Sequence, residues 1–174
     1  IKEENPSIGL LKGELASDYF NDMEVLNEFA ALNRVLIANN IVTALGGTIV
    51  DHVDKPHNYI ETMIEDDKPY IIIRKGAQSA KAFEEVLVPF NMRDGLMYGQ
   101  VIHSLKDNNY SFPHGAGRVL SRSKAKEQLN LDVFEEQMKD VYSSSVGYDT
   151  LDEAPNAYKP IMEIVDNTKD YLDD

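Results

Sequence analysis

The chain has 174 residues, a net charge of −13 and no cysteine. Its length and its hydrophobic content of 43% suit one sizeable core, so we expect a single domain over residues 1–174. Disulfide bonds and thiolate metal sites are excluded within these residues, and no apolar run is long enough to cross a membrane. We therefore expect a soluble, cytoplasmic protein with no membrane partner, whose acidic balance restricts any contact with nucleic acid to a local patch.

The first predicted element is a long amphipathic helix over residues 18–45, where apolar residues recur at steps of three and four. Gly46 and Gly47 are expected to end it, because glycine readily leaves helical backbone angles. A strand through Ile49 and Val50 is expected to follow.

Strand-like segments dominate the middle of the chain. The stretches at residues 59–64 and 70–73 are separated by turn-forming residues, which predicts a β-hairpin. Two further strands are expected at residues 85–89 and 96–102, before a polar loop at residues 106–109.

The last third of the chain is predicted to be mainly helical. Residues 118–128 have high helix propensity and no breaker, and a second helix is expected to start near Asn130 or Asp132. Two prolines punctuate a loop before a final helix that includes Ile161 and Ile164. The expected fold class is α+β, with mixed or antiparallel sheets and flanking helices.

The most informative segment is Pro113-His-Gly-Ala-Gly117. Glycines on both sides of Ala116 let the backbone approach a bulky ligand, and a helix that starts directly afterwards would point N–H groups toward a phosphate. His114 lies at the mouth of this arrangement, where its imidazole can act as a nucleophile toward phosphorus or as a general acid or base. The alternative is an ordinary turn that contains a histidine.

Two basic segments are candidates for anion binding. The first is Arg74-Lys-Gly-Ala77 at a strand end, for which a solvated guard of the sheet edge is the alternative. The second is a basic island on an otherwise acidic chain, which suits contact with phosphates. The cations of the basic island are Arg118, Arg122, Lys124 and Lys126.

His57 and Asn58 form a further candidate pair at the start of a predicted strand. The imidazole can supply a metal ligand, and the amide can contact a phosphate or a sugar. One imidazole does not build a metal site, so a structural role for His57 is the alternative. His52 and His103 lack comparable neighbours and are assigned no role.

Three blocks in the same order resemble the second half of RtcB-type RNA ligases: His57-Asn-Tyr59, Arg74-Lys-Gly-Ala77 and His114-Gly-Ala-Gly-Arg-Val-Leu-Ser-Arg122. The resemblance extends over nearly the whole chain through Asp22-Met23, Ala30-Ala-Leu-Asn-Arg34 and Asp152-Glu-Ala-Pro-Asn-Ala-Tyr-Lys159. It implies an RtcB-like fold, of which this chain is the carboxyl-terminal portion.

The resemblance implies a ligase that uses GTP and manganese (Mn²⁺) to join an RNA 3′-phosphate or 2′,3′-cyclic phosphate to a 5′-hydroxyl, in RNA repair or tRNA splicing. His114 is then the nucleophile that attacks the α-phosphate of GTP and carries GMP as a phosphoramidate. His57 is the implied manganese ligand, and Asn58 is expected to touch the guanylate. The backbone expected to hold the nucleotide comprises Gly115, Ala116 and Gly117.

The chain departs from the family pattern at Pro89-Phe-Asn-Met-Arg-Asp-Gly95, where many members carry Pro-Gly-Ser-Met-Gly against the nucleotide. This form resembles that of an RtcB-like subgroup, and its nucleotide contacts are expected to be made through the backbone or in altered form. The residues concerned are Pro89, Phe90, Asn91 and Met92. The first half of the family supplies an aspartate, a cysteine and two histidines to the metal site. An amino-terminal part of the same protein is therefore an expected partner, and this fragment alone is expected to be incompetent.

Two other functions remain open. The first is a binding module: a truncated or decayed homologue that keeps a nucleotide or RNA pocket without joining strands. The second is an enzyme that transfers nucleotidyl groups to another kind of phosphate end. Covalent GMP on the protein separates a ligase from a binder, and RNA with a 3′-phosphate or a 3′-hydroxyl separates the two enzymes.

Overall fold

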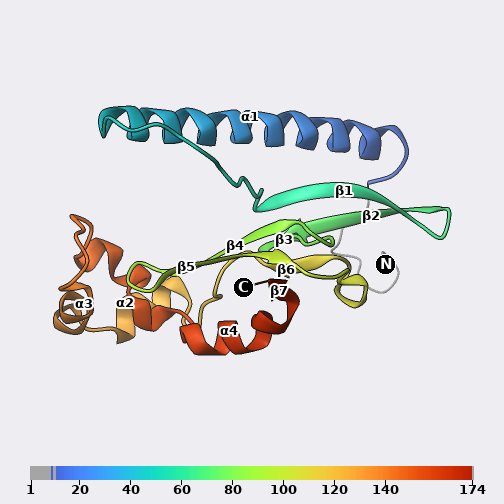
Figure 1. The fold of residues 1–174 in the computed structure, drawn as a ribbon. Helices are drawn as coiled ribbons and strands as arrows, with labels where there is room; N and C mark the ends of the chain where they lie inside the picture. Colours follow the sequence, from blue (N-terminus) through green and yellow to red (C-terminus); the bar gives the residue numbers. More distant parts are fainter. Residues whose placement is uncertain (1–8, 10, 174) are drawn as a thin grey trace. The chain divides into compact units, whose positions relative to one another are not determined.

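The computed structural model describes residue 9 and residues 11–173 (Figure 1). The chain divides into two compact units, Ile1–Lys75 and Gly76–Asp174. Helices and antiparallel strand pairs occur in both units, which confirms the expected α+β class. Within the described part of the chain, no helix has the length and apolar composition needed to span a bilayer.

The first unit contains one long helix, α1 (Glu14–Ala44). The helix ends as predicted, because Gly46 has a φ of 70° and turns the chain out of the helical path. No residue of α1 is buried, although all of its residues are described. Phe29 and Leu32 are 68% and 65% exposed, so the described residues leave much of its apolar surface uncovered.

The same unit contains the predicted β-hairpin, formed by β1 (Asn58–Glu65) and β2 (Lys68–Lys75). Asp66 and Asp67 connect the strands with φ values of 50° and 59°, as a type I′ turn requires. The strand expected through Ile49 and Val50 is wrong, since residues 47–56 form no regular element. Val50 is 95% exposed, so neither a strand partner nor a core supports an extended conformation there.

The second unit contains two small antiparallel sheets (Figure 1). One sheet pairs β3 (Ala77–Ser79) with β6 (Ser111–Pro113). The other has the order β4-β5-β7, with β4 (Glu85–Asn91), β5 (Gly95–Val101) and β7 (Leu172–Asp173). The strands expected at residues 85–89 and 96–102 are confirmed. The strands β3, β6 and β7 were not predicted, because two or three residues are too short to show an alternating pattern.

Three α-helices lie between β6 and β7 in the sequence: α2 (Arg122–Gln128), α3 (Leu131–Met138) and α4 (Ile161–Thr168). The helix α3 starts as predicted, since Asn130 Oδ1 accepts hydrogen bonds from Asp132 N and Val133 N in its first turn. Short 3₁₀ turns complete the unit: η1 (Lys106–Asn108), η2 (Tyr148–Glu153), η3 (Pro155–Ala157) and η4 (Lys169–Tyr171).

The helix expected over residues 118–128 begins only at Arg122, after the N-cap Ser121. Val119 N donates to Ala157 O at 2.9 Å, and Arg118 forms a β-bridge with Tyr158. This pairing with a distant segment overrides the local helix propensity. The glycine-rich stretch therefore does not lead directly into a helix, so the helix start predicted at the end of this stretch is wrong.

Two hydrophobic clusters hold the second unit together. The larger one joins the sheets to α4, with Val86, Val101 and Phe112 buried beside Ile164. The smaller one joins α3 to the 3₁₀ turns, and Phe134 at its centre is only 1% exposed. Full burial of such side chains stabilises the fold by about 1.5–3 kcal/mol each.

Candidate functional site

The glycine-rich loop at residues 114–117 directly follows β6. Ala116 is buried in the larger hydrophobic cluster, whereas His114 is half-buried. Gly117 has a φ of 75°, which a residue with a side chain adopts only under strain. Three backbone hydrogen bonds fix the loop: His114 N to Gly76 O at 3.3 Å, Ala116 N to Pro89 O at 3.0 Å and Lys159 N to Gly117 O at 3.1 Å.

The segment at residues 89–92 begins beside this loop, at Pro89. Pro89 supplies the carbonyl that accepts from Ala116 N, and its ring is exposed. Phe90 is 4% exposed and packs into the larger cluster, while Met92 packs against the smaller one. A bulky residue is therefore accommodated at position 90 because its side chain turns into the core.

Asn91 is used within its own turn. Its Oδ1 accepts from Arg93 N and Asp94 N, both at 3.0 Å, and its Nδ2 donates to Asp94 Oδ2 at 2.8 Å. The turn ends at Gly95, whose φ is 76°. Side-chain contacts from this segment to a ligand are therefore limited, and its backbone and Pro89 remain the available contacts.

Carboxylates from the η2 segment neutralise the basic island. Arg122 Nη1 lies 2.6 Å from Asp152 Oδ2 and also pairs with Glu153, and Lys126 Nζ lies 3.4 Å from Asp152 Oδ1. The hydrogen bond from Arg122 holds the pKa of Asp152 below its ordinary value, against the opposing effect of burial. Lys124, another cation of the island, forms no ion pair with another described residue.

Arg118 is held by Asp152 and Tyr158. Its Nη1 donates to Tyr158 OH at 2.9 Å, its guanidinium carbon lies 4.7 Å from the centre of the Tyr158 ring, and its Nη2 donates to Asp152 O. Burial and a hydrogen bond to Glu153 both raise the pKa of Tyr158. Burial also opposes ionisation of Glu153, but Tyr158 and Arg122 outweigh it and lower the pKa of that carboxyl. Contact between the island and a phosphate therefore has to compete with these carboxylates.

A pocket of about 390 Å³ lies between the turn at residues 91–94 and the segment at residues 155–160. Its cations are paired, since Arg93 Nε lies 2.7 Å from Asp94 Oδ1 and Lys159 Nζ lies 2.7 Å from Glu163 Oε1. The pocket thus offers a mixed polar surface rather than a concentrated positive charge.

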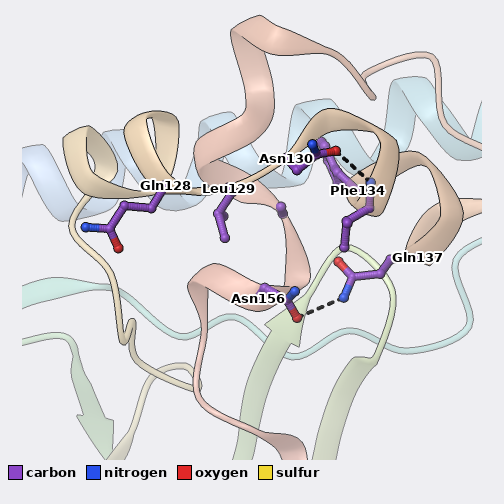
Figure 2. A pocket seen from close by; sticks show the side chains of 8 residues that line it. Gln128, Leu129, Asn130, Phe134, Gln137 and Asn156 are labelled. Atoms are coloured by element: carbon purple, nitrogen blue, oxygen red, sulfur yellow. Dashed lines mark hydrogen bonds between the residues drawn. The ribbon is translucent and has the colours of Figure 1, made fainter.

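A second pocket, of about 200 Å³, is lined by carboxamides and apolar side chains (Figure 2). Gln137 Nε2 donates to Asn156 Oδ1 at 2.8 Å across it. Leu129 and Phe134 contribute apolar surface, and none of its lining residues is charged. This composition suits neutral groups rather than phosphates.

His57 and Asn58 lie in the first unit, at the start of β1. His57 Nδ1 is 2.8 Å from Asn58 Oδ1. Because an amide oxygen only accepts, Nδ1 of the neutral ring carries the proton and Nε2 carries the lone pair that a metal ligand requires. Among residue 9 and residues 11–173, no three His, Cys, Asp or Glu side chains gather as a metal site.

Arg74 forms an internal ion pair in the first unit. Its side chain is 1% exposed, Nη1 lies 2.5 Å from Glu61 Oε2, and its guanidinium carbon lies 5.3 Å from the centre of the Tyr59 ring. The alternative of a solvated guard of the sheet edge is therefore wrong for Arg74, whereas Lys75 is exposed. An anionic ligand at Arg74 would have to compete with Glu61, which already pairs with this guanidinium.

Three residues that organise the second unit were not predicted. Asp152 and Glu153 carry the family resemblance, but their pairing with Arg122 was not predicted. The usable signal is that one segment is basic and the other is acidic, since opposite charges tend to pair. Gln78 was passed over entirely, yet its side chain is fully buried beside the loop. A carboxamide in a short strand gives no periodic signal from which its burial could be read.

The chain matches the family model described as tRNA-splicing ligase RtcB over residues 7–172. It is similar over 173 residues to the RNA-splicing ligase RtcB1 of Escherichia coli strain ATCC 25922 and to the RNA-splicing ligase RtcB of Escherichia coli strain K12, with 29% identity to each. Each match covers 92% of this chain and 41% of the relative, so the chain spans about two fifths of the length of these curated relatives. Since the family model matches nearly the whole sequence, the chain belongs to the RtcB family.

Proposed function

We propose that this chain is part of an RNA ligase that joins an RNA end with a 3′-phosphate or 2′,3′-cyclic phosphate to an end with a 5′-hydroxyl, with GTP as the activating nucleotide. Membership of the RtcB family supports this function. The observation that carries the proposal is the loop at residues 114–117, in which a histidine follows a strand and lies between fixed backbone positions.

In the proposed reaction, an imidazole nitrogen of His114 attacks the α-phosphate of GTP, a phosphoramidate bond forms and pyrophosphate leaves. The RNA 3′-phosphate then takes GMP from His114, which restores the imidazole. Attack by the 5′-hydroxyl on the activated RNA phosphate joins the strands and releases GMP. A cyclic phosphate is first opened by water to give the 3′-phosphate.

The backbone of the loop suits a nucleotide phosphate. The N–H of Ala116 is occupied by Pro89 O, whereas the N–H groups of Gly115 and Gly117 donate to no other residue in the described part of the chain. Neither glycine presents a side chain that would keep a phosphate away from these donors. We therefore assign phosphate binding to the backbone around Ala116.

Manganese is the metal proposed for this reaction, and when bound it would offset charge on the attacked phosphate and orient the leaving pyrophosphate. His57 fits as one imidazole ligand because its hydrogen bond to Asn58 fixes the ring tautomer that ligation requires. Asn58 is proposed to contact the guanylate. The remaining ligands have to come from residues outside those described, and we propose an amino-terminal part of the same protein as their source.

The first unit supports such a partner. Six apolar side chains of α1 are each at least 60% exposed: Leu15, Val25, Leu26, Phe29, Leu32 and Leu36. Apolar surface of this extent is normally covered by other protein. The two relatives are longer than the matched region, so they contain additional protein that can provide such a cover. We further propose a cytoplasmic setting, with RNA repair or tRNA splicing as the process served.

A second candidate is a module that binds a nucleotide or RNA without joining strands. The observation that favours it is the shortage of metal ligands within the described residues. A binder and a ligase differ in one decisive property, because only the ligase forms a covalent bond between GMP and the protein.

The test is the intact mass of the protein in its complete natural form, measured before and after incubation with GTP and manganese. The proposal expects a gain of one GMP that is lost in acid, as phosphoramidates are. His114→Ala should abolish the gain, whereas His103→Ala, at an exposed histidine beside Tyr171, should not. A wild-type protein that gains no mass would favour the binding module. RNA with a 3′-hydroxyl should not be joined, since it lacks the phosphate to be activated.

A further inference from the structure

Gln78 is the polar residue most completely buried beside the glycine-rich loop. It lies at the centre of β3 and is 0% exposed. Its Nε2 donates to Leu87 O at 2.8 Å and to Pro113 O at 2.7 Å, and its Oε1 accepts from Leu87 N at 3.2 Å. Both amide protons and the amide oxygen are therefore used, and all three partners are backbone atoms.

These bonds join two sheets that share no strand. Leu87 belongs to β4 of the three-stranded sheet, and Pro113 ends β6 of the two-stranded sheet. The carboxamide of Gln78 takes the place of a peptide group, because it pairs with both the N–H and the C=O of Leu87. The side chain of Gln78 thus bridges β4 and the end of β6.

His114 comes directly after the carbonyl that Gln78 binds. On its other side, Ala116 N is fixed by Pro89 O, two residues beyond Leu87 on the same strand. The loop is therefore attached to β4 at two points, one before and one after His114. Without the first attachment, Pro113 and His114 would still be held to β3 and Gly76, but the β3-β6 pair could shift relative to β4, while the second attachment would keep the loop near β4.

We propose that Gln78 is a positioning residue that sets the distance and direction of His114 relative to the nucleotide. This inference rests on the proposed function, because it concerns the reactivity of the same histidine. A carboxamide is required, since a glutamate lacks the two donors and a methionine lacks all three hydrogen bonds while keeping a similar shape. Displacement of a reacting group by about 1 Å can reduce a rate by on the order of 10²-fold.

The test is single-turnover labelling of the complete natural protein with GTP and manganese, for wild type, Gln78→Met and Gln78→Glu. Val86→Ala is the matched control, because Val86 is also fully buried but, unlike Gln78, has no polar side-chain atom that could bind Pro113 O. Circular dichroism identifies a temperature at which each protein is folded. The rate constant, the labelled fraction and the GTP concentration at half-maximal rate are then measured.

The proposal expects at least a tenfold lower rate constant in both Gln78 variants, with nearly unchanged half-maximal GTP concentration and a normal rate constant in Val86→Ala. A purely structural role would lower the labelled fraction and leave the rate constant of the folded protein unchanged, which would overturn the proposal. Failure of both Gln78 variants to fold would also overturn it in favour of a structural role. Absence of labelling in wild type would instead refute the proposed function itself.

Discussion

The two glycines of the loop allow one backbone conformation to be tested in a matched pair of variants. Gly117 has a φ of 75°, where a Cβ costs about 1–2 kcal/mol. Gly115 does not have a φ in this range, and a Cβ there would lie 3.5 Å from Pro89 O, an ordinary contact. Both changes to alanine restrict the unfolded chain equally. The difference between Gly117→Ala and Gly115→Ala therefore isolates the conformational strain, at about 1–2 kcal/mol.

The assay is equilibrium unfolding in urea, with the free energy of unfolding compared between the two variants. We expect Gly117→Ala to be the less stable, and a Cβ at this position meets only Lys159 Cδ at 3.8 Å, so steric overlap adds little. Equal stability of the two variants would refute the left-handed conformation assigned to Gly117. A lower stability of Gly115→Ala would contradict the ordinary 3.5 Å contact between a Cβ at position 115 and Pro89 O.

Three further predictions concern the second unit. Phe134→Ala should lower the free energy of unfolding by about 3–5 kcal/mol because the ring is buried. Val133→Ala changes a side chain that is 48% exposed and should alter the free energy of unfolding by about 0.5 kcal/mol or less. Urea titration of the two variants compares these free energies. Asn130→Ala should cost about 0.5–2 kcal/mol by removing the cap of α3, and an unchanged melting temperature would show that the cap contributes nothing. The pKa of Asp152 is lowered chiefly by its hydrogen bond from Arg122. The ionised carboxylate therefore contributes its full stabilisation above the pH at which an aspartate of the unfolded chain ionises. This stabilisation is lost as the pH falls through the lower pKa of the folded state. The stability gap between wild type and Asp152→Asn should therefore narrow below about pH 4, and a gap that widens on acidification would contradict the pairing.

Much of the fold could be predicted from local patterns. The hairpin of the first unit and the strands β4 and β5 follow from alternation and turn residues, and α3 follows from its cap at Asn130. The failures arise where the presence or absence of a partner elsewhere in the fold decides the conformation. Residues 118–120 pair with residues 157–158 instead of forming helix, and Val50 finds no partner at all among the described residues.

For the candidate site, the residues of the loop could be predicted but their surroundings could not. The glycines and His114 are recognisable because the loop has a distinctive local sequence, and the structure places Pro89 beside them. The environment of these residues was not predictable, since the burial of Phe90 and the three hydrogen bonds of Gln78 depend on how separate sheets pack. Composition also suggested a solvated Arg74, whereas Glu61 and an aromatic ring enclose it.

The ion pairs of the second unit change how its basic residues should be interpreted. Arg122 and Lys126 follow the glycine-rich loop in sequence, which suggests phosphate contact, but both face Asp152. The carboxylate and the RNA phosphate would compete for the same guanidinium, so any gain from binding RNA is reduced by the loss of the existing pair. The same pairs connect α2 to η2, and Lys159 N, beyond that turn, holds Gly117 O. An acidic chain is therefore compatible with a phosphate site built from backbone N–H groups, because such a site does not depend on these paired cations.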